Sequence, residues 1–179
     1  MTQQALEIKI LRQHWIKDDG KNDREDICSH GELFIRFGSK ILSNTEDGAW
    51  ALNVCGLFLM RSLGKDCGID EFENYMAPCC GHFWVPNDEN NFVTIQGCNM
   101  GIDWKTEHLK NDVKLTSEKG DSCEIPFDEY RNIVAKFINE VEDFYGDPKL
   151  KVIPNDKFDQ DGFNQFWAEW NSLKLKWSI

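Results

Sequence analysis

The chain has 179 residues, of which 41% are hydrophobic and 28% are charged, as in many globular proteins. Twenty Lys and Arg stand against 31 Asp and Glu, which gives a net charge of −11. A charge of this sign repels nucleic acid and anionic membrane surfaces and attracts basic partners. The length favours one domain over residues 1–179. We therefore expect an acidic single-domain protein that binds neither nucleic acid nor membrane. The alternative explanation of the acidity is that it only keeps the chain in solution.

The seven cysteines cannot all pair within the chain, because their number is odd. Residues 1–5 lack the basic and apolar regions of a signal peptide. The longest nearly apolar run, residues 48–60, is too short to span a bilayer. These features predict a cytoplasmic protein whose cysteines are free thiols.

The first part of the chain predicts strands on both sides of a polar loop. Residues 6–16 alternate imperfectly between apolar and polar side chains and predict a first strand, and residues 17–26 form the loop. Residues 31–37 place Leu33, Ile35 and Phe37 on one face. With a two-residue turn at 38–39 and a return over 40–42, this stretch predicts a hairpin.

The pattern changes at residues 49–63, whose apolar side chains leave almost no polar face. A helix that is apolar nearly all round is buried in the middle of a protein. Gly64 follows as its stop signal. We expect a central helix here.

Residues 65–76 predict a loop, and two apolar runs between residues 77 and 104 flank the polar segment 87–91. The arrangement predicts a second hairpin, in which glycines mark tight bends or close packing. Three short strands are predicted next, at residues 104–110, 113–117 and 123–126.

Residues 130–145 carry one apolar stripe over four turns and predict an amphipathic helix that ends at Gly146. Residues 163–173 predict a last helix, with Asp159 and Asp161 as candidate caps and its aromatic side chains in the core. The order of elements predicts an α+β domain: a mostly antiparallel sheet, a buried central helix and two C-terminal amphipathic helices.

Four side chains of types that bind zinc, Cys79, Cys80, His82 and Cys98, lie close together in the sequence. The usual Cys-x₂₋₄-Cys pair is missing, and adjacent cysteines in an extended segment point to opposite faces. We therefore expect thiols that pack as small hydrophobic groups, with no metal and no cofactor. A zinc-stabilised structural domain stays as an alternative.

A second alternative is a small cytoplasmic enzyme, in which Cys80 or Cys98 is the nucleophile and His82 or His108 the base. Nothing in the sequence brings such a pair together. We expect no catalytic residue and no enzymatic activity.

Three segments together resemble a group of small bacterial proteins. They are residues 78–82 (PCCGH), 97–104 (GCNMGIDW) and 166–170 (FWAEW). The chain, from about residue 31 to 170, is similar in this pattern to immunity proteins of polymorphic toxin systems, including contact-dependent growth inhibition. The resemblance implies a protein that binds and neutralises a cognate toxin domain without catalysis. Such toxins are frequently basic nucleases, for which an acidic partner is electrostatically suited.

If the protein binds a basic toxin, carboxylates on its surface are the candidate contacts. We place first those of the loop, because loops carry recognition more often than helix faces do. The alternative is that these charges are simply solvated. The candidates are Asp18, Asp19, Asp23, Glu25 and Asp26 in the loop, and Glu129, Glu140 and Asp143 on the polar face of the helix at 130–145.

Overall fold

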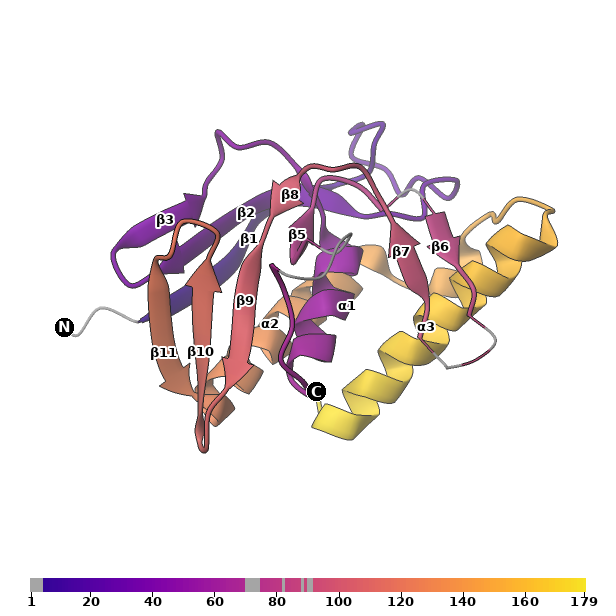
Figure 1. Cartoon of the computed structure of the whole chain (residues 1–179). Helices are drawn as coiled ribbons and strands as arrows, with labels where there is room; N and C mark the ends of the chain where they lie inside the picture. The colour runs from indigo at the N-terminus through magenta and orange to yellow at the C-terminus, as the bar shows by residue number, and fades with distance from the viewer. Residues whose placement is uncertain (1–4, 70–74, 82, 88, 90–91) are drawn as a thin grey trace.

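The computed structural model describes residues 5–69, 75–81, 83–87, 89 and 92–179. Its elements are eleven strands, three α-helices and one 3₁₀ helix within these residues (Figure 1). The strands are β1 Leu6–His14, β2 His30–Phe37, β3 Lys40–Ser43, β4 Trp50–Ala51, β5 Ala77–Pro78, β6 Phe83–Val85, β7 Thr94–Gln96, β8 Gly101–Ile102, β9 Trp104–His108, β10 Asp112–Ser117 and β11 Ser122–Pro126. The helices are α1 Leu52–Ser62, α2 Phe127–Tyr145, η1 Pro148–Leu150 and α3 Lys157–Trp177.

The largest sheet is built around β2. This strand pairs antiparallel with β1 along its whole length, and its other edge pairs with β4 at the start and β3 at the end. The alternation read from the sequence is correct, because Leu33, Ile35 and Phe37 of β2 are almost completely buried. A second antiparallel sheet has the order β11-β10-β9. The predicted α+β class with mostly antiparallel strands is confirmed.

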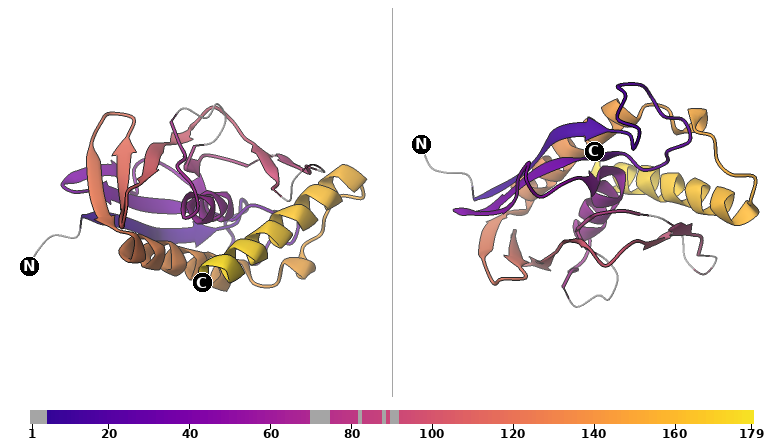
Figure 2. Two further views of the ribbon diagram at one scale, coloured as in Figure 1. Left: turned by 60° about the horizontal axis from the view of Figure 1, so that its bottom comes forward. Right: turned by 90° about the horizontal axis from the view of Figure 1, so that it is seen from above.

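Helix α1 lies in the middle of the molecule, with α2 on one side and the chain from β5 to β9 on the other (Figures 1 and 2). Its residues from Leu52 to Met60 are all buried. The central helix is therefore confirmed. It is shorter than predicted, because Trp50 and Ala51 extend the sheet as β4 beside β2 before the helix begins.

The two C-terminal helices close the core. Helix α2 buries Tyr130, Val134 and Ile138 from its apolar stripe and ends at Gly146, as predicted. Helix α3 begins earlier than predicted, because the side chain of Asp156 caps its first turn by accepting the N–H groups of Phe158 and Asp159. The expected caps at Asp159 and Asp161 were therefore wrong.

Helix α3 packs closely on strand β6. A Cβ added at Gly162 would lie 1.7 Å from the carbonyl oxygen of Trp84, so this contact requires glycine. One turn further along, the ring of Phe166 stacks on Trp84 with centroids 4.0 Å apart. Among the described residues, no helix is long and apolar enough to cross a membrane.

Candidate functional site

The loop between β1 and β2, residues 15–29, carries the five carboxylates that the sequence analysis places first. It begins at Trp15, whose ring is buried against the C-terminal end of α2. The ring centroids of Trp15 lie 5.0 Å from Phe144 and 5.2 Å from Tyr145. This aromatic contact fixes the start of the loop on the helix.

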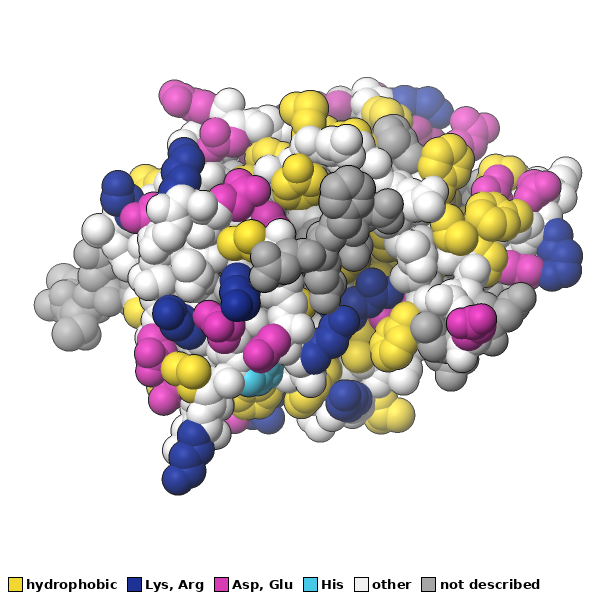
Figure 3. Space-filling model, viewed as in Figure 1, with side chains coloured by type: hydrophobic (Ala, Val, Ile, Leu, Met, Phe, Trp, Pro, Cys, Tyr) yellow, Lys and Arg dark blue, Asp and Glu magenta, His cyan; other side chains and the backbone are white. Residues whose placement is uncertain are grey.

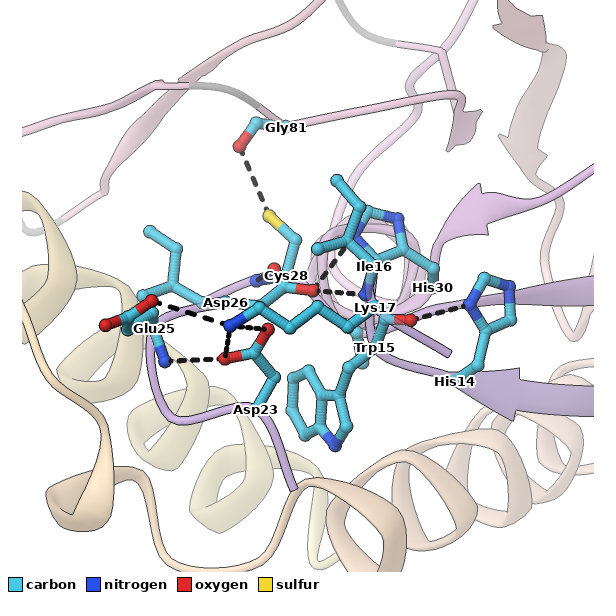
Figure 4. Close-up of polar contacts among 12 residues, drawn as sticks. His14, Trp15, Ile16, Lys17, Asp23, Glu25, Asp26, Cys28, His30 and Gly81 are labelled. Carbon is cyan, nitrogen blue, oxygen red and sulfur yellow. Dashed lines mark hydrogen bonds and ion pairs between the residues drawn. The ribbon is translucent and has the colours of Figure 1, made fainter. Parts of the chain in front are cut away.

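Asp26 joins the two ends of the loop (Figure 4). Its carboxylate accepts the N–H of Ile16 at 2.8 Å and that of Cys28 at 3.0 Å, and it lies 3.4 Å from the Nε2 atom of His30. Burial raises the pKa of Asp26, but the hydrogen bonds from His30 and the two N–H groups outweigh this and leave the pKa below its ordinary value. The carboxylate of Asp26 thus holds the two ends of the loop together.

Asp23 also points into the protein. Its carboxylate accepts the N–H of Glu25 at 3.1 Å and pairs with the ammonium group of Lys17 at 3.0 Å (Figure 4). The hydrogen bond from Lys17 lowers the pKa of Asp23. Like Asp26, this carboxylate stabilises the conformation of the loop.

A buried lysine lies under the loop. The ammonium nitrogen of Lys151 is 3.1 Å from the ring centre of Trp15, and it donates to the carbonyl oxygen of Asp23 at 2.7 Å. Burial lowers the pKa of Lys151 to about 8. Sequence reasoning missed this residue, because a lysine between Leu150 and Val152 in a segment without periodicity carries no signal of burial.

The end of the loop is bound to α1. The first helical N–H, that of Leu52, donates to the carbonyl oxygen of Ser29 at 2.7 Å. The side chain of Asn53 accepts the N–H of Ser29 at 3.2 Å and donates to the carbonyl oxygen of Ile27 at 3.1 Å. Asn53 is completely buried. The signal in the sequence is a single amide in an apolar run, since a buried amide needs hydrogen-bond partners.

The five loop carboxylates therefore fall into two groups. The side chains of Asp23 and Asp26 are only 6% and 10% exposed, so the expectation that they lie on the surface was wrong. Their inward hydrogen bonds are the physical reason. Those of Asp18, Asp19 and Glu25 are 41%, 49% and 77% exposed. Asp18 pairs with Arg12, Asp19 lies 3.9 Å from Lys21, and Glu25 lies 3.5 Å from Lys17.

Two of the three helix carboxylates lie at the loop end of α2. Gln13, at the end of β1, donates to the carbonyl oxygen of Glu140 at 2.8 Å, and Asp143 precedes Phe144, which contacts Trp15. Glu140 is half exposed and Asp143 exposed. Glu129 is half buried at the other end of the helix, about 21 Å from Asp143 at 1.5 Å per residue. The fold thus brings the loop, Glu140 and Asp143 together and leaves Glu129 apart.

The face in Figure 3 carries a mixture of charges. Acidic and basic side chains are interspersed over it, and several basic ones gather near its centre beside hydrophobic groups. One described pocket, of about 440 Å³, is basic and aromatic, with Arg61, Lys65, Phe92, Lys176 and Trp177 in its wall. A larger one, of about 710 Å³, lies between the end of α2 and α3 and includes Lys151 and Trp167. Among the described residues that line these two pockets there is no cysteine and no histidine.

The cysteines near residue 80 are arranged differently from the expectation. The backbone N–H of Cys98 donates to the sulfur of Cys80 at 3.2 Å, and both Cys79 and Cys80 lie near enough to Cys98 to affect its pKa, so the two adjacent side chains do not point to opposite faces. The reason is a bend at Cys79, which ends strand β5. His82, the fourth candidate, lies outside the described residues. Among the described residues, no group of three His, Cys, Asp or Glu has a geometry that could hold a metal ion.

The described histidines make other contacts. His14 and His30 stack with centroids 6.0 Å apart, and the Nε2 atom of His108 lies 2.8 Å from the carbonyl oxygen of Ser62. None of these contacts involves Cys80 or Cys98, and the other candidate base, His82, lies outside the described residues.

Comparisons with protein-family models, with curated proteins and with solved structures found no match.

Proposed function

We propose that this protein is an immunity protein, which binds a cognate basic toxin domain stoichiometrically and blocks it without catalysis. The observation that carries the proposal is the anchored acidic loop. Asp18, Asp19 and Glu25 are exposed on a loop that Asp23, Asp26 and the buried ring of Trp15 hold in place. The net charge of −11 and the resemblance to immunity proteins support the same function.

The inward hydrogen bonds favour binding through the exposed side chains. A loop that is already ordered loses less conformational entropy when a partner binds, so more of the interaction energy appears as affinity. Exposed carboxylates steer a basic partner towards the loop and mainly accelerate association. Glu140 and Asp143 at the adjoining end of α2 extend this acidic surface.

The proposal places the protein in the cytoplasm of the cell that makes the toxin. There it meets toxin that enters from a neighbouring cell, before the toxin reaches its substrate. Neither a nucleic acid nor a membrane is a partner, since both repel a chain of this charge.

The test co-expresses the protein with its cognate toxin domain, which the proposal expects to be encoded upstream of its gene. The loop variant Asp18→Asn/Asp19→Asn/Glu25→Gln removes three exposed charges. The matched control Glu46→Gln/Glu118→Gln/Glu124→Gln also removes three, from other exposed positions. Two of these lie on the β10–β11 hairpin, away from the loop in Figure 2.

We expect wild type and control to protect cells and to form a one-to-one complex in calorimetry at low salt. The loop variant should associate more slowly by a factor on the order of ten, as expected when charges that steer association are lost. Cell death despite folded wild-type protein, with no complex at low salt, would refute the function. Equal association rates for the loop variant and the control would refute the choice of surface alone.

A further inference from the structure

Three thiols meet at a break in a long hairpin. The ladders β5–β8 and β6–β7 have the same antiparallel register. Ala77 pairs with Ile102 and, six residues further along each strand, Phe83 pairs with Gln96. The two ladders are therefore halves of one hairpin. Cys79 and Cys80 lie in the break on one strand, and Cys98 lies in it on the other.

The contacts at the break hold these side chains close together. The backbone N–H of Cys98 donates to the sulfur of Cys80 at 3.2 Å. The N–H of Cys79 donates to the carbonyl oxygen of Met100 at 2.9 Å, and the thiol of Cys98 lies 3.9 Å from the same oxygen. With an N–Cα bond of about 1.46 Å, the sulfur of Cys80 is within about 4.7 Å of the Cα atom of Cys98.

The remaining cysteines differ in their surroundings. Cys28, Cys55 and Cys123 are buried, and burial raises the pKa of Cys28 and Cys123 to about 12. The three clustered thiols are half exposed. The hydrogen bond from the Cys80 thiol, with a smaller one from Cys79, lowers the pKa of Cys98. Since the thiolate is the nucleophile, the lowered pKa favours Cys98 over Cys79 and Cys80 as the attacking thiol.

We propose that Cys98 and Cys80 form an oxidation site, at which a hydroperoxide converts the two thiols into a disulfide that joins the strands of the hairpin. The thiolate sulfur of Cys98 attacks the peroxide O–O bond, which breaks and releases hydroxide or alkoxide, and leaves a sulfenic acid on Cys98. The sulfur of Cys80 then attacks the Cys98 sulfur. The S–S bond forms, the S–O bond breaks, and the proton of Cys80 leaves with the oxygen as water. The peroxide is reduced by two electrons, and the two thiols lose them.

The test treats the reduced full-length protein with hydrogen peroxide, blocks the remaining thiols by alkylation and maps the peptides without reduction. We expect one cross-linked peptide pair that contains Cys80 and Cys98, a mass loss of two hydrogens, and complete reversal by dithiothreitol. Cys80→Ser should stop the reaction at a sulfenic acid on Cys98, which a cyclic 1,3-diketone traps. Cys67→Ser is the control, since Cys67 is also half exposed, and it should react like wild type.

Cys98→Ser should slow the loss of thiols by at least about ten-fold, because the remaining thiols react as ordinary or buried ones. Circular dichroism checks that each variant is folded. Wild-type oxidation kinetics in folded Cys98→Ser would overturn the proposal. So would a cross-link that joins Cys79 to Cys80, a cross-link between two chains, or folded wild-type protein that forms no disulfide.

Discussion

The surroundings of Lys151 link one side chain to the stability of the acidic loop. Its ammonium group lies over the ring of Trp15 and donates to the backbone of Asp23, so the charge is placed where the loop closes on α2. Desolvation at this position lowers the pKa from 10.5 to about 8. Between these two values the unfolded chain binds more protons at this site than the folded protein does. The contribution of Lys151 to the free energy of unfolding therefore rises with pH across this window.

We predict that the stability of Lys151→Met relative to wild type depends on pH. The variant lacks the titrating group, so wild type should gain stability relative to it as the pH rises from about 8 to 10.5. Both proteins share the titrations of their cysteines and tyrosines, so the difference isolates Lys151. Urea unfolding of the two proteins in parallel across this range measures it. A difference that stays constant with pH contradicts the lowered pKa.

Single residues also show where sequence reasoning stops. The sequence places Asp23 and Asp26 in the same acidic loop as Asp18 and Glu25, but only the tertiary structure determines which carboxylates point inward. Asp26 accepts hydrogen bonds from N–H groups at both ends of the loop. The start of the loop is held in place where Trp15 packs against Phe144 and Tyr145, well over a hundred residues away. No local pattern contains that information.

At the scale of elements, the sequence predicted helix α1 by composition and helix α2 by periodicity. The apolar residues of α1 predict burial on every side, and the structure surrounds this helix with α2, α3 and strands. The ends of elements were harder to predict, because they depend on pairing with distant chain. Trp50 and Ala51 join β2 as a strand, and Asp156 rather than Asp159 caps α3. Periodicity therefore identified the elements, while tertiary contacts set their limits.

We predict that Leu57→Ala destabilises the protein by about 2–5 kcal/mol, through lost burial and the cavity left behind. Leu57 is completely buried in α1. Leu175→Ala in α3 is the matched control, because that side chain is 84% exposed, and it should cost less than about 0.5 kcal/mol. Chemical denaturation of both variants gives the comparison. Near-wild-type stability of Leu57→Ala would show that α1 is not the centre of the core.

At the scale of the whole molecule, one buried ion pair joins three parts of the chain. Arg61 of α1 binds Glu169 of α3 through two nitrogens, at 2.6 and 2.7 Å. The residue before β7, Val93, donates its N–H to the same carboxylate at 2.9 Å, and its carbonyl oxygen accepts from Arg61 at 2.6 Å. The side chain of Glu169 is only 2% exposed. The central helix, the last helix and the hairpin are thus held by one set of charged hydrogen bonds.

We predict a strong energetic coupling between Arg61 and Glu169. Removing either partner of a buried pair leaves the other charge uncompensated, so Arg61→Ala and Glu169→Ala should each cost about 3–5 kcal/mol. In the double variant neither charge remains, and its cost should be well below the sum of the two single costs. Urea denaturation of the four proteins completes the double-mutant cycle.

The pair Lys136 and Glu140 on α2 provides the control cycle, because its side chains are 71% and 38% exposed. For such a pair, water and salt screen the charges, and the coupling should be only about 0.3–0.5 kcal/mol. The contrast between the two cycles separates burial from charge, since both pairs consist of one cation and one carboxylate. If the Arg61–Glu169 coupling is as small as that of the exposed pair, these contacts do not hold α3 against the core. The apolar packing of α3, which includes the stacking of Phe166 on Trp84 and the burial of Trp170, would then hold this helix on the rest of the fold.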